Sequence, residues 1–114
     1  MKTFKNCAAQ GDLLLVRVNE VPVSFAKTES LDNRFIVAHS ETGHHHVVED
    51  RNVEYYTNPE DEMKAYLVVQ GIIGAQLAHL RDFDTHETLL IPQGIFELRR
   101  QREYTPQGWR RVED

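Results

Sequence analysis

The apolar residues of this chain occur in short runs rich in β-branched side chains, and turn-forming residues separate these runs. The runs occupy residues 12–18, 34–39, 53–57, 63–69 and 88–91. Apolar runs this short, bounded by Gly, Pro, Asn or Asp, are typical of β-strands. Several such strands at regular spacing predict an all-β fold, either a compact small barrel or a two-sheet sandwich of short antiparallel strands.

The turns between the runs predict some of the strand pairs. A turn at Gly43 pairs 34–39 with the His-His-Val-Val-Glu run at 45–49, and Pro92-Gln93-Gly94 forms a tight turn. In Thr105-Pro106-Gln107-Gly108, proline and glycine stand where a type I turn favours them. This turn predicts an antiparallel hairpin between the strand of 95–104 and the Trp-Arg-Arg-Val run. The Asn-Pro-Glu-Asp-Glu stretch at 58–62 is a loop by composition.

The segment 72–83 has two interpretations. Ile73, Leu77 and Leu80 have helical spacing, so one short helix is an alternative. Gly71 and Gly74 disfavour a helix, and a strand is therefore favoured.

Length and composition limit the class of protein. The chain of 114 residues fits a single domain, 1–114, and 40% hydrophobic with 27% charged residues indicates a globular rather than a disordered chain. A net charge of −5 argues against nucleic acid and anionic membranes as partners of the whole molecule, although a local basic patch is not excluded. With Cys7 as the single cysteine, neither an intramolecular disulfide nor a thiolate metal cage can form. No signal peptide and no apolar stretch of membrane-spanning length is recognisable, so we expect a soluble cytoplasmic protein.

The histidines are the strongest chemical feature. Alternate residues of a strand point to the same face, so His44 and His46 would lie together. His79 and His86, near the ends of predicted strands, are candidates for the remaining ligands. Imidazoles without thiolates suit a divalent transition metal such as Zn, Fe, Mn, Ni or Cu. The alternatives are solvated loop histidines and a proton-sensitive surface.

Catalysis is left open by the sequence. No nucleotide-binding, phosphate-binding or hydrolase motif occurs, and no base is recognisable beside Cys7. Glu49 is the one general-base candidate, and Tyr55 and Tyr56 fit a half-buried strand without a catalytic role.

The order of motifs resembles a group of small bacterial and phage proteins, most of them without an assigned activity. The resemblance covers nearly the whole chain, and Gln-Arg-Glu-Tyr-Thr-Pro is its most specific piece. The matching residues are Gln10-Gly11-Asp12, Thr42-Gly43-His44-His45-His46, Tyr66-Leu67, Leu77-Ala78-His79, His86, Pro92-Gln93-Gly94, the 101–106 piece with Arg100, and Arg111-Val112-Glu113-Asp114.

This resemblance implies a convergent cluster of His44, His46, His79 and His86, and it implies no particular reaction. One departure bears on that cluster. The two later histidines are close together in the family pattern, whereas six residues separate His79 from His86 here.

The C-terminal hairpin supports a second hypothesis. Arg100, Arg102, Tyr104, Trp109 and Arg110 combine cations with aromatic rings, which can hold a protein or nucleic-acid partner. In that case the protein is a non-enzymatic interaction module, with homo-oligomer formation as a further option. The alternative is a structural hairpin whose arginines pair with Glu97, Glu103 and Glu113 and whose tryptophan covers the core.

Overall fold

The structure, a computed structural model, describes residues 1–29, 34–38, 45–80, 88–100, 102–105 and 108–111. All regular structure within these ranges is β-strand, which confirms the all-β prediction, and they include no helix, short or membrane-spanning. The strands are β1 (Lys2–Thr3), β2 (Cys7–Gln10), β3 (Leu13–Val18), β4 (Ala26–Thr28), β5 (Arg34–Ala38), β6 (His45–Glu49), β7 (Val53–Thr57), β8 (Lys64–Val69), β9 (Ala75–Leu80), β10 (Leu89–Ile91), β11 (Gly94–Arg100), β12 (Arg102–Thr105) and β13 (Gly108–Arg111).

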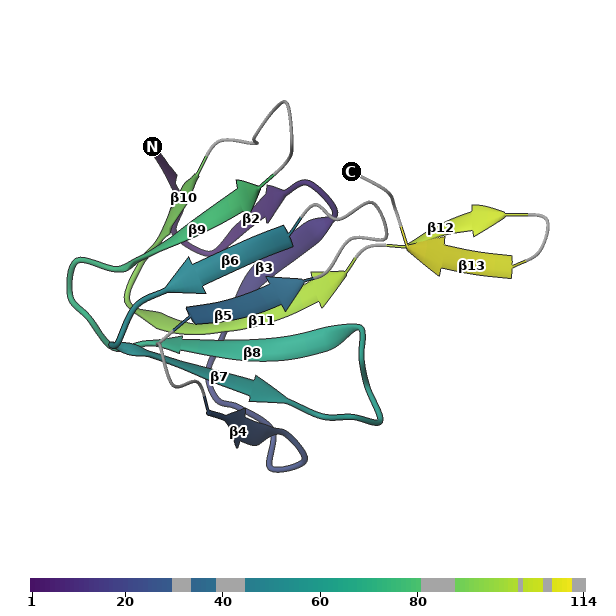
Figure 1. Cartoon of the computed structure of the whole chain (residues 1–114), viewed down its shortest axis with the longest axis horizontal. Coiled ribbons are helices and arrows are strands. Elements are labelled where there is room, and N and C mark those ends of the chain that lie inside the picture. Colours follow the sequence, from purple (N-terminus) through teal and green to yellow (C-terminus); the bar gives the residue numbers. More distant parts are fainter. Residues whose placement is uncertain (30–33, 39–44, 81–87, 101, 106–107, 112–114) are drawn as a thin grey trace.

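The strands form two main sheets and one separate pair (Figure 1). One sheet has five strands in the order β1-β10-β9-β6-β5, and the other has six in the order β2-β3-β11-β8-β7-β4. Neighbouring strands are antiparallel, except that β1 is parallel to β10. Neither sheet closes on itself within the described strands, so the fold is the sandwich and not the small barrel.

The core lies between the two sheets because alternate residues of each strand point inward. In the six-stranded sheet β3, β8 and β11 bury apolar residues at every second position. One continuous cluster contains Leu13, Leu15, Val53, Tyr55, Ala65, Leu67, Val69, Phe96 and Leu98 from the six-stranded sheet and Phe35, Val37, Val48, Ala75, Leu77, Leu89 and Ile91 from the five-stranded sheet. Since both sheets contribute to this cluster, their apolar faces cover each other.

The two ends of the sandwich differ in how the chain connects the sheets. The connections β6–β7, β8–β9 and β10–β11 each pass from one sheet to the other, and the strand registers place all three at the same end, the crossover end. At the opposite end, the open end, β2 turns into β3 and β7 into β8 within one sheet. Described connections therefore tie the sheets covalently at the crossover end and not at the open end.

The ambiguous segment 72–83 begins in a turn at the crossover end. The Gly74 amide donates to the Gly71 carbonyl oxygen at 3.0 Å, and Gly74 has a φ of 84°, a left-handed conformation that glycine favours. The chain then continues as β9, so the strand interpretation is confirmed for 75–80, while 81–83 lie outside the described residues.

The C-terminal hairpin is shorter than the sequence suggests. β11 ends at Arg100, and its neighbours are β3 and β8. β12 and β13 pair only with each other among the described strands, with Thr105 opposite Gly108. The predicted antiparallel hairpin is thus confirmed, while residues 106–107 of its turn lie outside the described residues. The long strand of 95–104 is wrong, because its two halves belong to different sheets.

A buried carboxylate lies on the outer face of the six-stranded sheet. Tyr66 donates a hydrogen bond of 2.7 Å to Glu97, and Arg99 donates another from its Nε. The ring of Phe25 packs edge-on against Tyr66 with centroids 4.8 Å apart. Burial alone would raise the pKa of Glu97, but the hydrogen bonds from Arg99 and Tyr66 outweigh it and lower that pKa. Burial and Glu97 raise the pKa of Tyr66 to about 12.

The Gly74 turn gives a first prediction. A Cβ at Gly74 would overlap the carbonyl oxygen of Ile91 and would occupy a strained backbone, so Gly74→Ala should lower the free energy of unfolding by at least about 2 kcal/mol. Gly71→Ala is the matched control, because its Cβ would meet Asn52 at an ordinary 3.5 Å. Urea unfolding of both variants measures the difference, and equal stabilities would contradict this reading of the turn.

The Glu97 cluster gives a prediction on pH. Because folding lowers the pKa of Glu97 below its ordinary value of 4.5, the carboxylate stabilises the fold above pH 4.5, and this contribution is lost as pH falls through the folded-state pKa. Glu97→Gln should therefore lower the unfolding free energy at pH 7 by about 1.5–3 kcal/mol and by less at pH 3. Urea titrations at both values test this, with exposed Glu20→Gln as the control. If Glu97→Gln lost as much unfolding free energy at pH 3 as at pH 7, the stabilising role of the carboxylate would be contradicted.

Candidate functional site

A network of buried polar side chains joins the sheets near the open end. His46 of β6 is fully buried; its Nδ1 lies 2.9 Å from Oε1 of Gln10 and its Nε2 lies 3.1 Å from Oδ1 of Asp12. Gln10 also donates from Nε2 to the carbonyl oxygen of Leu77, at 2.8 Å. The turn between β2 and β3 aims Gln10 and Asp12 inward, and Gly11 at its centre has a φ of 56°. One turn of the six-stranded sheet thus holds β6 and β9 of the five-stranded sheet.

The partners of His46 define where its protons lie. Because the Gln10 amide nitrogen donates to Leu77, its oxygen faces His46, and Nδ1 must be the donor in that contact. On the other side of the ring, Nε2 faces the Asp12 carboxylate at 3.1 Å. Both ring nitrogens are therefore engaged with protein atoms, which suits a side chain that fixes its neighbours in place.

This network unites two separate sequence motifs. Gln10 and Asp12 come from the Gln-Gly-Asp motif, and His46 comes from the Thr-Gly-His-His-His motif. Sequence reasoning selected His46 as a metal ligand and gave Gln10 and Asp12 no role. The available signal was that both motifs belong to one pattern, but strand spacing alone does not reveal which motifs meet across a sandwich.

The predicted metal site has no support within the described residues. They contain no group of three or more His, Cys, Asp or Glu side chains arranged to hold a metal ion. His79 stands directly opposite His46 in the register of β6 and β9, whereas His44 and His86 lie outside the described residues. Glu49, the general-base candidate, is exposed on β6. The four-histidine site stays a prediction.

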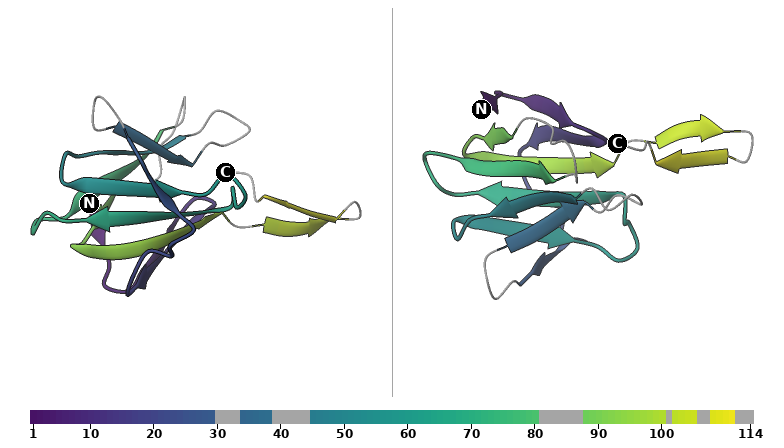
Figure 2. Two further views of the ribbon diagram at one scale, coloured as in Figure 1. Left: turned by 90° about the horizontal axis from the view of Figure 1, so that it is seen from below. Right: turned by 45° about the horizontal axis from the view of Figure 1, so that its top comes forward.

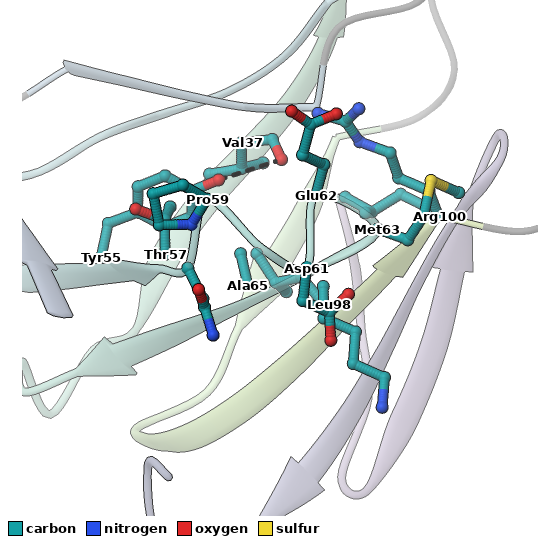
Figure 3. A pocket seen from close by; sticks show the side chains of 13 residues that line it. Val37, Tyr55, Thr57, Pro59, Asp61, Glu62, Met63, Ala65, Leu98 and Arg100 are labelled. Carbon is teal, nitrogen blue, oxygen red and sulfur yellow. Dashed lines mark hydrogen bonds between the residues drawn. The ribbon is translucent and has the colours of Figure 1, made fainter. Parts of the chain in front are cut away.

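A pocket of about 270 Å³ opens between the sheets at the open end (Figure 3). Its base is formed by buried residues from both sheets, namely Leu13, Val37, Tyr55, Ala65 and Leu98. More exposed residues complete it, namely Thr57, Asn58, Pro59, Asp61, Glu62, Met63, Lys64 and Arg100. An apolar base beneath charged and polar groups is the usual composition of a ligand site.

Tyr55 is the buried polar group of this pocket. Its hydroxyl donates to the carbonyl oxygen of Val37 at 3.3 Å, which ties β7 to β5 across the sandwich. Burial raises the pKa of Tyr55, and the charge of Arg100 opposes this without reversing it, so the phenol stays protonated. Figure 3 shows the charged ends of Glu62 and Arg100 pointing toward each other above the pocket.

The sequence assigned these residues differently. The sequence predicts a loop over 58–62 and places Tyr55 in a half-buried strand without a catalytic role. The structure places both at the pocket, together with Arg100 from the predicted partner-binding set. The other four members of that set, Arg102, Tyr104, Trp109 and Arg110, lie on β12 and β13, with Tyr104 opposite Trp109.

The comparisons with known proteins place this fold in a family. A family model described as a domain of unknown function (DUF8820) matches residues 9–101. The chain belongs to this family. No curated protein and no solved structure matches the chain. The DUF8820 match includes Gln10, Asp12, His46 and every residue that lines the pocket, and it ends before β12. The finer pattern shared with bacterial and phage proteins stays a prediction.

The buried network gives a prediction on stability. His46→Ala leaves Asp12 and Gln10 without their shared partner in the interior, so the free energy of unfolding should fall by about 3–5 kcal/mol. Glu49→Ala, on the same strand but exposed, should change it by less than about 0.5 kcal/mol. Urea denaturation followed by tryptophan fluorescence and circular dichroism provides the comparison. A His46→Ala protein as stable as Glu49→Ala would show that the network does not hold the sheets together.

Proposed function

We propose that this protein is a protein-interaction domain whose open-end pocket receives a short cationic segment carrying an apolar or aromatic side chain. The observation that supports this proposal is the composition of the pocket. Buried Leu13, Ala65 and Leu98 offer an apolar surface. The loop above them adds Asp61 and Glu62 to the lining, beside Lys64 and Arg100, and Glu60 precedes them in the sequence. An apolar anchor would occupy the base while cationic groups beside it approach the acidic loop.

The size of the pocket favours a side chain over a large cofactor. Its volume of about 270 Å³ falls just below the range of roughly 300–1,000 Å³ that is usual for sites of drug-sized ligands. A single large side chain with its neighbouring backbone fits a site of this size. Interface hot spots have this form, with one anchoring residue in a pocket and polar groups around it.

Charge favours a cationic segment. The chain has a net charge of −5, so the field of the whole molecule attracts cations. At the pocket, Arg100 is directed at Glu62 (Figure 3), and a cationic partner can approach the carboxylates of Asp61, which lines the pocket, and of the exposed Glu60 beside it. Tyr55 contributes a hydroxyl oxygen that can accept a further hydrogen bond, since its proton is donated to Val37.

The test uses the dipeptide amide Arg-Trp-NH₂ as the probe and Glu-Trp-NH₂ as its opposite in charge. In an ¹H–¹⁵N NMR titration, Arg-Trp-NH₂ should shift the amides of the pocket residues, and Glu-Trp-NH₂ should bind more weakly. Asp61→Lys should weaken binding of Arg-Trp-NH₂ about fivefold, a loss of about 1 kcal/mol expected for one reversed surface charge.

The matched control is Glu49→Lys, which changes the net charge equally but stands on β6, outside the pocket. It should bind Arg-Trp-NH₂ within about twofold of the parent. Equal binding of the two dipeptides, or shifts confined to residues away from the pocket, would overturn the proposal.

A further inference from the structure

The β12–β13 hairpin stands apart from the sandwich. It leaves the open end directly after Arg100, and all three views show it projecting beyond both sheets (Figures 1 and 2). Its two strands pair only with each other among the described strands. We refer to β12 and β13 together as the arm.

A projecting arm of this kind needs a surface to pack on. An isolated two-stranded hairpin is at best marginally stable in water. Tyr104 stands opposite Trp109 in the register. A cross-strand pair contributes in general about 0.2–1 kcal/mol, which does not offset the entropy of ordering eight residues. A second protein surface would provide the missing burial.

The residues of the arm match the ligand class of the pocket. The arm carries Arg102, Arg110 and Arg111 against Glu103, a net charge of +2, and it contains Tyr104 and Trp109. Since the net charge of the whole chain is −5, the net charge of the chain without the arm is −7. Arginine, tyrosine and tryptophan are the residue types enriched at interface hot spots. The arm is thus a cationic segment with aromatic side chains, and it belongs to a strongly acidic chain.

We propose that the arm of one molecule docks at the open-end pocket of a second copy, so that two molecules exchange arms. This inference rests on the proposed function, because it names the partner that supplies the cationic segment. Nucleic acid is the other class of partner that a basic aromatic hairpin could bind. The net charge of −7 on the rest of the chain would, however, repel nucleic acid as it approaches.

The position of the arm allows the exchange to be mutual. Arg100 lines the pocket and is separated from the arm by one residue, so arm and pocket are neighbours on the same end of the molecule. Each strand of the arm has four residues, a length of about 13 Å at 3.3 Å per residue. When two open ends face each other about a twofold axis, each arm meets the other pocket, which closes the assembly as a dimer.

The experiment reverses the charge on each side separately in the full chain. The arm variant is Arg102→Glu/Arg110→Glu, and the loop variant is Glu60→Lys/Asp61→Lys. Size-exclusion chromatography with light scattering should show a dimer for the parent. Each variant alone should be a monomer, because its arm and loop then carry charge of the same sign. An equimolar mixture of the two variants should form a heterodimer, since both contacts in it are again complementary.

The mixture keeps the test independent of folding, because a variant that fails to fold cannot regain its partner on mixing. Circular dichroism of each variant provides the check. A parent that is a monomer at millimolar concentration would overturn the second copy as the partner, and so would a dimer unaffected by both reversals. A monomer that shifts mass only on addition of a DNA duplex would overturn it in favour of nucleic acid. In each case, binding of Arg-Trp-NH₂ by the parent shows whether the proposed function of the pocket still stands.

Discussion

The contact of His46 with Gln10 and Asp12 is the interaction on which the open end depends. At the crossover end, the described connections β6–β7, β8–β9 and β10–β11 run from one sheet to the other, so the chain itself holds the layers together. At the open end the described turns stay within one sheet, and non-covalent contacts must do this work. His46 belongs to the five-stranded sheet and its two partners to the six-stranded sheet. Their hydrogen bonds have strict geometry, so they fix the relative position of the sheets more closely than apolar contacts would.

The network acts on specificity more than on net stability. Burying a histidine with a carboxylate has a desolvation penalty that their attraction offsets only in good geometry, and apolar residues of similar volume can be as stable. An apolar replacement would, however, allow one sheet to slide over the other. At this end such sliding would distort the pocket, because Val37 belongs to one sheet and Leu13 and Leu98 to the other. The Tyr55 hydroxyl, bonded to the Val37 carbonyl oxygen, resists the same movement.

Local pattern was sufficient to predict the strands but not the site. The β-branched runs and the turn formers yield the strands β3, β5, β7 and β8 to within a residue or so at each end, because strand formation is largely decided by neighbouring residues. The pairing of β5 with β6 follows from the same signals. The meeting of His46 with Gln10 depends on which strands face each other across the core, and no local pattern encodes this. The division between β11 and β12 was missed for a related reason, since the sequence continues without a turn signal where the chain leaves its sheet.

The distribution of charge along the chain agrees with the way the fold separates its parts. Arginines are concentrated after residue 98, whereas acidic residues prevail in the rest of the chain. In a hairpin packed on its own sandwich, such arginines would find carboxylates within the same molecule, as Arg99 does with Glu97. The described strands of the arm pair with each other and with neither main sheet, which sets its cationic residues and its aromatic residues apart from the sandwich. Their natural counterpart is an acidic surface with an apolar depression, and the open end of another copy presents that surface next to the point from which its own arm departs.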